Sequence, residues 1–469
     1  MTPSGKPNVL FLFTDDQRFD TLAAPGNEHV RTPNLDKLAA RGTSFTRAHI
    51  MGGTSGAVCM PSRAMLHTGR SLFHIEGRGQ TIPAEHTTMG ECFRAAGYQT
   101  FGAGKWHNGR ESYARSFTDG DEIMFGGMAD HWNMPAYHYD PSGRYESVLP
   151  YCVDALSSNV VNHRAADHVA AGEHSTDLLA AATETFLRNR STDRPFLAYV
   201  SFLAPHDPRT MPQEFLDMYD PEEIELPANF AGAHPFDNGE LKVRDEKLED
   251  WPRTPEAVRR HIAEYYAMIS HVDAAVGRIL QALKDAGEDD NTIIVFAGDN
   301  GLAVGQHGLM GKQSLYEHSI RVPLMFAGPG VPAGQRREQF VYLHDALPTL
   351  CDLCGLDAPP SAESMSLAPA LADPAAETRA TLMFAYRHLQ RGVKDERYKL
   401  IEYVVDGRRR TQLFDLDEDP CETRDLSGEA DQTERIEALR GELSRWRDEV
   451  DDPGGVGEES SFWAGYERS

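Results

Sequence analysis

Apolar runs alternate with helical patterns through the first two thirds of the chain. Residues 8–14 form a nearly continuous apolar run, which is typical of a strand buried on both faces of a parallel sheet. Residues 33–42 begin with Pro-Asn and end in glycine, a pattern that predicts a helix with a glycine stop. The alternation predicts an α/β fold. Further strands are expected at 98–102, 195–202, 292–297 and 322–327, and further helices at 89–97, 175–189, 255–286 and 345–353.

Two stretches interrupt this pattern. From residue 112 to about 164, aromatic, glycine and histidine residues crowd together without clear periodicity. A long irregular insertion of this kind is expected to form a binding surface. Residues 220–255 are acidic and contain proline, which predicts an excursion over the surface.

The end of the chain has a different composition. Residues 358–376 are rich in Ala, Pro and Ser and indicate a boundary. We therefore expect a large domain at 1–370 and a C-terminal subdomain at 371–469. The subdomain is predicted to hold a small sheet and one helix, with strands at 382–386 and 398–403 and the helix at 432–450.

Composition and charge narrow the classes of protein. Of 469 residues, 40% are hydrophobic and 25% charged, as in an ordinary globular chain, and no apolar run of about 18 residues predicts a membrane span. The 46 basic residues are outnumbered by 72 acidic ones, and the net charge of −26 argues against binding to nucleic acid. An anionic substrate would need its own cluster of cationic side chains and a divalent cation.

The N-terminal sequence and the number of cysteines help to predict the cellular compartment of the protein. Residues 1–8 lack the basic and apolar regions of a signal peptide, which predicts a cytoplasmic protein, or a periplasmic or secreted one if a leader precedes the printed sequence. Six scattered cysteines are not a disulfide framework. Cys351 and Cys354 have the spacing of a redox or metal pair. However, they lie in an apolar helical run, and the sequence has no second Cys-x-x-Cys pair to complete a metal site. We therefore expect both cysteines to pack a helix against the core.

The stretch around Cys59 has the strongest candidate chemistry. A small-residue loop at 52–57 leads into Cys59, and Pro61 and Ser62 then favour the start of a helix. Free N–H groups and the helix dipole at such a terminus attract anions, and Arg63 lies one turn further along. The alternative is a buried structural cysteine at a helix cap.

Acidic, basic and imidazole side chains follow several predicted strands. Asp15 and Asp16 follow the first strand, and Asp299 and Asn300 follow the strand at 292–297. Their oxygens suit calcium or magnesium, although each pair alone is also typical of a turn or a helix cap. Loops after other strands carry the remaining candidates, Lys105, His107, His206 and Lys312, any one of which would usually be a solvated side chain.

Taken together, these residues resemble the type I sulfatases. Cys-x-Pro-Ser-Arg at 59–63, followed by Thr-Gly-Arg at 68–70, resembles the family signature, and the Gly-Lys-Trp-His at 104–107, Pro-His at 205–206 and Gly-Lys at 311–312 follow in the family's order. The resemblance covers nearly the whole chain. It implies an alkaline phosphatase-like α/β/α sandwich with a mixed, mostly parallel central sheet and a smaller C-terminal α+β subdomain. Asn300 stands where some relatives have histidine.

The resemblance also implies a mechanism and cofactors. Cys59 would be converted by a formylglycine-generating or sulfatase-maturating enzyme to formylglycine, whose hydrate attacks sulfur. Lys105, Lys312 and Arg63 would spread the charge of the sulfuryl oxygens, His206 would protonate the leaving alcohol, and His107 would take the proton whose removal expels sulfate. One calcium ion, rather than magnesium, is implied, with ligands Asp15, Asp16, Cys59, Asp299 and Asn300.

The substrate is expected to be a sulfated carbohydrate or other sulfated small molecule. A pocket for it is predicted from residues of the insertion, of the loop after His206 and of the subdomain: His131, Trp132, Asp207, Arg209, Arg387 and His388. Each of these has the alternative of simple packing or solvent exposure. A phosphonate monoester or phosphodiester hydrolase is the enzymatic alternative, and a carbohydrate-binding protein with an unoxidised Cys59 is the alternative outside enzymes.

Overall fold

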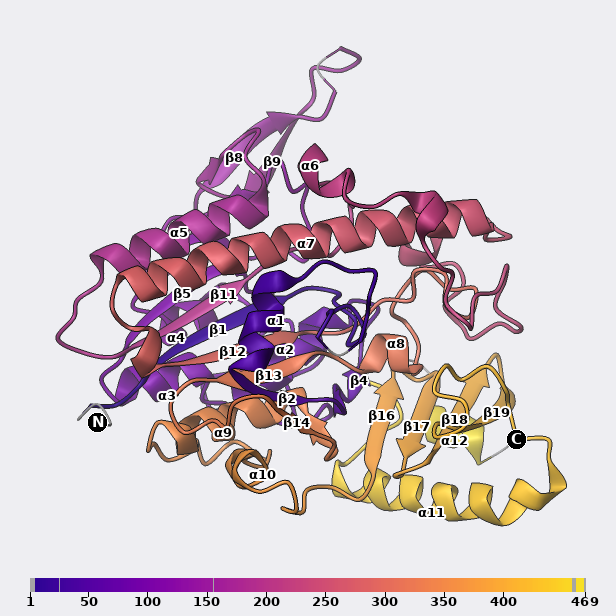
Figure 1. The fold of residues 1–469 in the computed structure, drawn as a ribbon. Helices are drawn as coiled ribbons and strands as arrows, with labels where there is room; N and C mark the ends of the chain where they lie inside the picture. Colours follow the sequence, from indigo (N-terminus) through magenta and orange to yellow (C-terminus); the bar gives the residue numbers. More distant parts are fainter. Residues whose placement is uncertain (1–4, 25, 155, 458–460, 468–469) are drawn as a thin grey trace.

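An eight-stranded sheet forms the centre of the computed structural model, which describes residues 5–24, 26–154, 156–457 and 461–467 (Figure 1). The first four residues of the predicted N-terminal stretch 1–8 lie outside these ranges. The strand order is β14-β2-β13-β12-β1-β11-β5-β6, and only β13 runs antiparallel to its neighbours. The strands are β1 (Asn8–Thr14), β2 (Gly42–Phe45), β5 (Gln99–Lys105), β6 (Asp119–Met124), β11 (Phe196–Ser201), β12 (Thr292–Gly298), β13 (Leu324–Ala327) and β14 (Gln335–Arg337).

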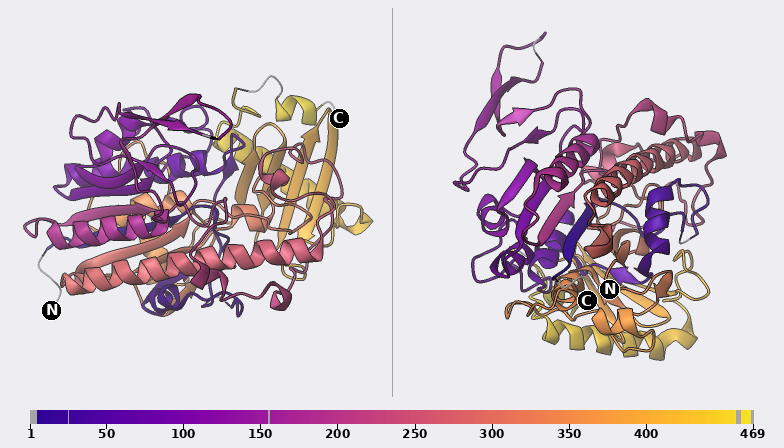
Figure 2. Two further views of the ribbon diagram at one scale, coloured as in Figure 1. Left: turned by 90° about the horizontal axis from the view of Figure 1, so that it is seen from above. Right: turned by 60° about the vertical axis from the view of Figure 1, so that its left-hand side comes forward.

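Helices cover both faces of this sheet. Alternate residues of β1 point to opposite faces, so Val9, Phe11 and Phe13 pack in one core cluster while Leu10 and Leu12 pack in another. Figures 1 and 2 show the resulting layers. The first cluster includes α2 (Cys59–Thr68), α3 (Met89–Ala95) and α9 (Ala346–Leu353), and the second includes α1 (Pro33–Ala40), α5 (Ser175–Asn189) and α7 (Pro255–Asp285).

These elements confirm the predicted α/β architecture. The helix predicted at 175–189 has those bounds, and the predicted strand at 8–14 is β1. Cys351 is fully buried in α9 and Cys354 follows that helix directly, so both pack in the core as expected. None of the helices in the described ranges is both long and apolar enough to cross a membrane.

A second, five-stranded sheet follows in the C-terminal part. Its order is β19-β18-β17-β16-β4, and α11 (Thr433–Glu449) and α12 (Phe462–Tyr466) pack on it (Figure 1). The strand β4 comes from the predicted small-residue loop and pairs in parallel with β16, where Gly52 lies opposite Ala385. The sequence did not predict β17 and β19. The bounds are β4 (Gly52–Gly53), β16 (Leu382–Tyr386), β17 (Gln390–Lys394), β18 (Tyr398–Val405) and β19 (Arg408–Asp415).

The insertion after residue 112 is more regular than predicted. It supplies β6 at the edge of the central sheet and a hairpin that projects from the body (Figures 1 and 2). The expectation of an irregular segment was wrong because β6 (DGDEIM) is an edge strand with charged residues and the hairpin is largely exposed, so neither has an apolar pattern. The other elements here are α4 (Arg110–Ser116), β7 (Pro135–Ala136), β8 (Val148–Cys152), β9 (Val161–Ala165) and β10 (His168–Val169).

Short elements complete the chain. Two of them, β3 and β15, pair with each other, and the predicted surface excursion at 220–255 contains only short 3₁₀ turns. The short helices and strands are β3 (Ala48–His49), β15 (Val341–Tyr342), α6 (Gln213–Leu216), α8 (Glu317–Ile320) and α10 (Ala368–Ala372).

Candidate active site

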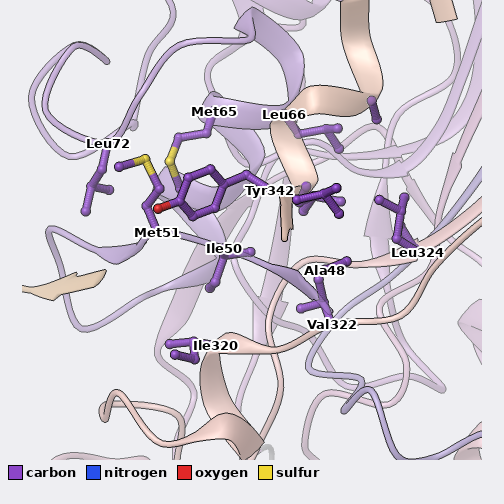
Figure 3. Packing of buried hydrophobic residues seen from close by; sticks show 14 of the residues in the cluster. Ala48, Ile50, Met51, Met65, Leu66, Leu72, Ile320, Val322, Leu324 and Tyr342 are labelled. Carbon is purple, nitrogen blue, oxygen red and sulfur yellow. The ribbon is translucent and has the colours of Figure 1, made fainter. Parts of the chain in front are cut away.

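The helix α2 begins at Cys59 and is held in the core on nearly all sides. Its Met65 and Leu66 pack among apolar side chains that include Met51 and Tyr342 (Figure 3). It ends at Gly69, which has φ +66 and forms a left-handed cap. At the other end the Ser62 hydroxyl donates to the carbonyl oxygen of Asp299 over 2.6 Å. The N-terminus of α2, and Cys59 with it, is thereby fixed at the carboxyl edge of the central sheet.

Neighbouring parallel strands deliver the acidic pairs to the same place. Thr14 of β1 lies opposite Gly298 of β12, so the residues that follow these two strands meet. The Asp16 N–H donates to Asp299 Oδ1 over 3.0 Å, and Asn300 Nδ2 donates to Asp16 Oδ1 over 2.7 Å. Asp16 has φ +65, an uncommon conformation outside glycine that turns its carboxylate into the cluster.

Two lysines and two histidines surround these carboxylates and Cys59. Lys105, the last residue of β5, donates to Asp15, and its Nζ lies 3.5 Å from Cys59 Sγ. Lys312 Nζ donates to Asp16 Oδ1 over 2.5 Å. His107 Nδ1 lies 3.6 Å from Cys59 Sγ, and His206 Nε2 lies 3.6 Å from Asp16 Oδ2. The structure thus brings together all the predicted catalytic and metal-binding residues.

Arg63 has a different position from the one expected of a residue that touches substrate. It has no exposed surface, and its guanidinium donates to Asp299 Oδ2 over 2.9 Å, to the Lys105 carbonyl over 2.9 Å and to Ser201 Oγ over 2.6 Å. Arg63 therefore ties the ends of three strands together beneath the site.

The carboxylate cluster fits a divalent cation. Asp15 Oδ1, Asp16 Oδ2 and Asn300 Oδ1 are buried and have no hydrogen-bond partner among the described residues. Ligand atoms of Asp15, Cys59 and Asp299 lie within 4.8 Å of one another. Buried polar atoms without partners are costly, and a hard cation such as calcium satisfies oxygen donors of this kind.

Burial and neighbouring charges shift the pKa values of the titratable groups in the site. Burial and the nearby Asp15 carboxylate raise the pKa of Asp299, while the charges of Lys105, His206 and Arg63 outweigh burial and lower the pKa of Asp15. Burial raises the pKa of the Cys59 thiol, so an unmodified cysteine here is a poor nucleophile at neutral pH. Burial and the neighbouring Lys105 lower the pKa of His107, which is therefore neutral and able to accept a proton.

A cavity of 270 Å³ opens above Cys59. Part of its wall comes from the 220–255 segment, which the sequence indicated only as a surface excursion. Arg244 of this segment pairs with Asp207 and with Asp245 Oδ1, the latter at 2.6 Å. No sequence signal marked Arg244. The lining residues are Gly56, Ala57, Cys59, His107, Gly127, Met128, His206, Val243, Arg244, Asp245, Lys312 and Gln313.

None of the six predicted substrate-side residues lines this cavity in the described structure. His131 is 1% exposed, and its Nε2 lies 3.0 Å from the His206 carbonyl oxygen, so it faces the protein backbone. Asp207 pairs with Arg244, and Arg209 Nη1 lies 2.5 Å from His261 Nδ1. The half-buried Trp132 packs edge-on to a histidine ring.

The two subdomain candidates lie elsewhere. Arg387 and His388 line a separate cavity of 570 Å³, and Arg387 Nη1 pairs with Glu240 Oε1 at 2.6 Å. Sequence patterns marked these residues as polar or aromatic on loops, but the direction of each side chain depends on the packing of its loop.

Comparison with known proteins decides the family. Residues 7–356 match the family model described as Sulfatase, which is well over half of the chain. The chain belongs to the sulfatase family. Residues 305–449 of this sulfatase also match a model described as N-sulphoglucosamine sulphohydrolase, C-terminal. The protein is therefore a sulfuric ester hydrolase, as the sequence predicts.

Individual relatives agree with this assignment. The sulfatase is 30% identical to an arylsulfatase of Clostridium perfringens over 93% of each chain, and 25% identical to an N-acetylglucosamine-6-O-sulfatase of Bacteroides thetaiotaomicron over 92% of this chain and 85% of that one. Its structure superposes on the phosphonate monoester hydrolase of Agrobacterium radiobacter with a TM-score of 0.74, at 25% identity and over 95% and 96% of the two chains. The fold is the predicted alkaline phosphatase-like one.

Proposed function

We propose that this sulfatase removes O-sulfate groups from a sulfated carbohydrate, with residue 59 as the nucleophile after its conversion to formylglycine. The observation that carries the proposal is the position of Cys59 Sγ, which lies at a helix N-terminus, 3.5 Å from Lys105 Nζ and within 4.8 Å of ligand atoms of Asp15 and Asp299. Burial raises the pKa of a thiol in this place despite the nearby Lys105 and Lys312, so the surroundings suit an oxygen nucleophile better than sulfur.

The cofactors follow from the same donor set. Asp15, Asp16, Asp299, Asn300 and residue 59 would hold calcium, which, when bound, would lower the pKa of a hydroxyl of hydrated formylglycine and make it a better nucleophile. The modification requires a formylglycine-generating or sulfatase-maturating enzyme as a partner.

The side chains around residue 59 then have separate tasks. Lys105 and Lys312 neutralise charge on the sulfuryl oxygens. His107, neutral at physiological pH, accepts a proton at Nδ1, which faces residue 59. His206 also lines the cavity and donates a proton to the departing oxygen. Arg63 positions Asp299 from below and does not contact substrate.

The assignment to carbohydrate rests on two supports. The relative from Bacteroides thetaiotaomicron is named for a sulfated sugar, and it matches over 92% of this chain. The cavity combines the half-exposed Met128 with the polar groups of Arg244, Asp245 and Gln313, a mixture suited to the apolar and hydroxyl faces of a sugar.

Intact-mass analysis tests the nucleophile. We expect active enzyme to be about 18 Da lighter than the encoded chain, because a carbonyl oxygen replaces the thiol sulfur and two hydrogens, a product outside the usual thiol oxidation ladder. Cys59→Ala should abolish turnover, and Cys152→Ala, at an exposed cysteine, should leave both the mass deficit and the activity intact. Because hydration of the aldehyde restores about 18 Da, the deficit is read on the dehydrated form. Full activity in a protein whose residue 59 reacts as a free thiol would contradict the proposal.

A phosphonate monoester or phosphodiester hydrolase is the second candidate, because the Agrobacterium radiobacter enzyme of that name shares this fold over almost the whole chain. Parallel assays with a sulfated sugar, an aryl sulfate, a phosphonate monoester and a phosphodiester at equal concentration separate the two. We expect the highest kcat/KM for the sulfated sugar. A higher value for the phosphonate monoester or the phosphodiester would favour the second candidate.

A further inference from the structure

A second cluster of candidate ligands lies at the edge of the central sheet, away from Cys59. His138, Asp167 and His168 offer ligand atoms within 4.8 Å of one another. Two carboxylates of β6 reach the same histidines: His138 Nδ1 lies 2.7 Å from Asp121 Oδ1, and His168 Nε2 lies 3.1 Å from Glu122 Oε2. The cluster therefore joins two imidazoles and three carboxylates from three separate segments.

A bulge in β6 creates this convergence. Successive residues of a strand normally point to opposite faces, so Asp121 and Glu122 would not share a site. Asp121 pairs with Ala103 and Ile123 with Gly104, which leaves Glu122 as the extra residue, and Glu122 has φ +49. Bulges of this kind redirect side chains and are common beside active sites.

The charge of the cluster is not balanced by a permanent cation. In the described ranges, the ion pairs of Asp121, Glu122 and Asp167 are with His138 and His168 only, and no lysine or arginine takes part. Burial is outweighed by Asp167 and Glu122, which raise the pKa of His168, so a proton on this ring offsets part of the charge at lower pH. When both imidazoles are neutral, the cluster carries three negative charges. A divalent cation would offset most of this charge and use the ring nitrogens as ligands.

We propose that His138, Asp167 and His168 bind one divalent transition-metal ion of the zinc type, while Asp121 and Glu122 hold the two imidazoles from outside. A mixture of imidazole nitrogens and carboxylate oxygens favours zinc and its neighbours over calcium, which prefers oxygen alone. The His138 ring stacks on the His168 ring with their centroids 4.0 Å apart, so the two imidazoles already lie side by side. The His138 side chain is 65% exposed, while Glu122 and His168 are largely covered.

The position of the cluster gives the ion a structural task. Residues 125–134 connect β6 to β7, and His168 of β10 pairs with Ala136 of β7. Gly127 and Met128 of this loop line the cavity above Cys59. An ion on His138, Asp167 and His168, whose imidazoles also bond to the carboxylates of β6, fixes both ends of the loop and so steadies one wall of the cavity.

Zinc titration in saturating calcium tests the proposal. We expect isothermal calorimetry to show one zinc equivalent that calcium does not displace, and zinc to raise the melting temperature. His138→Gln and His168→Gln should each weaken this site by about tenfold or more. His163→Gln, at an exposed histidine of the β8–β9 hairpin, is the matched control and should bind as the wild type does.

Any zinc bound at other positions is expected to be the same in the wild type and in the three variants. A difference in binding between these proteins therefore reports on this site alone. His138 is exposed, and its variant is expected to fold normally, which circular dichroism checks. An absence of zinc binding to the wild type, or unchanged stoichiometry and affinity in the folded His138→Gln protein, would overturn the proposal.

Discussion

Single residues at the carboxyl edge of the sheet determine where the reacting groups lie. Asp16 and His107 have φ values of +65 and +73, although neither is a glycine. Such conformations cost free energy and persist only where the surrounding contacts impose them, which is common at functional sites. Here they direct the Asp16 carboxylate toward Asn300 and Lys312, and the His107 imidazole toward residue 59.

The role of His206 as a proton donor can be tested with leaving groups. Replacement by alanine should lower kcat/KM by about 10²–10⁴-fold for a sulfated sugar, because its alkoxide needs protonation, and much less for nitrophenyl sulfate. Cys152→Ala, at an exposed cysteine outside the cavity lining, should leave the activity toward both substrates unchanged. Equal losses for both substrates in the His206 variant would remove the general-acid role.

His131 is expected to position His206. Its Nε2 lies 3.0 Å from the His206 carbonyl and its Nδ1 lies 2.8 Å from Ser175 Oγ, so His131→Phe leaves both partners unpaired and lets His206 shift. We expect kcat/KM for a sulfated sugar to fall by about tenfold to a hundredfold. His131→Gln, which retains a side-chain donor, should recover part of the loss, and the absence of any loss in His131→Phe would contradict this role.

At the scale of elements, α2 is held between two sheets. Its N-terminus is tied to the end of β12, and the strand β4, which precedes it by a few residues, is part of the C-terminal sheet. The C-terminal sheet thereby contributes to the placement of Cys59, although its other four strands, β16 to β19, are far from residue 59 in sequence.

Gly52 is the position where this attachment is most sensitive. It has φ +96, and a Cβ there would lie 2.0 Å from the Ala385 carbonyl oxygen, so Gly52→Ala must separate β4 from β16. We expect the free energy of unfolding to fall by about 2 kcal/mol or more, with reduced activity, measured by urea unfolding. Gly441→Ala, in the open part of α11, should be neutral or stabilising by up to about 1 kcal/mol. Similar stability of both variants would contradict the prediction.

At the scale of the whole molecule, buried neutral histidines make the fold sensitive to acid. Burial lowers their pKa values because the charged imidazolium is poorly solvated in the core. In the unfolded chain these histidines take up protons below about pH 6.5. In the folded protein they take up protons only at a much lower pH. The pKa is lowered to about 3 for His67, His174 and His307 and to about 4 for His49, His131, His234 and His344.

The folded state is therefore less stable at acidic pH. The stability contributed by these groups is complete above about pH 6.5 and is lost as the pH falls toward 4. His234, whose ring nitrogens have no partners in the described structure, packs on Phe236 and Tyr316. Relative to wild type, His234→Phe should gain about 1–2 kcal/mol of unfolding free energy between pH 7.5 and pH 5, measured by urea unfolding at both values. An identical difference at both pH values would contradict this account.

The limits of sequence-based prediction are clearest in the loops. Buried strands such as β1 and long helices such as α5 have periodic apolar patterns, so the sequence predicted them within a residue or two. β6 and the hairpin β8–β9 were missed because edge and exposed strands have no such pattern. Arg244 reaches the cavity from a segment without any periodicity, so its role depends on long-range contacts alone.

The sequence by itself determined the α/β fold, the family and the set of groups around Cys59, because strand patterns and short motifs are local properties of the chain. Only the tertiary structure decided that Arg63 lies beneath the carboxylates, that β4 joins the C-terminal sheet, and that a bulge turns Glu122 toward His168 while Asp121 contacts His138. These features depend on the register and packing of segments far apart in the sequence, which local patterns do not encode.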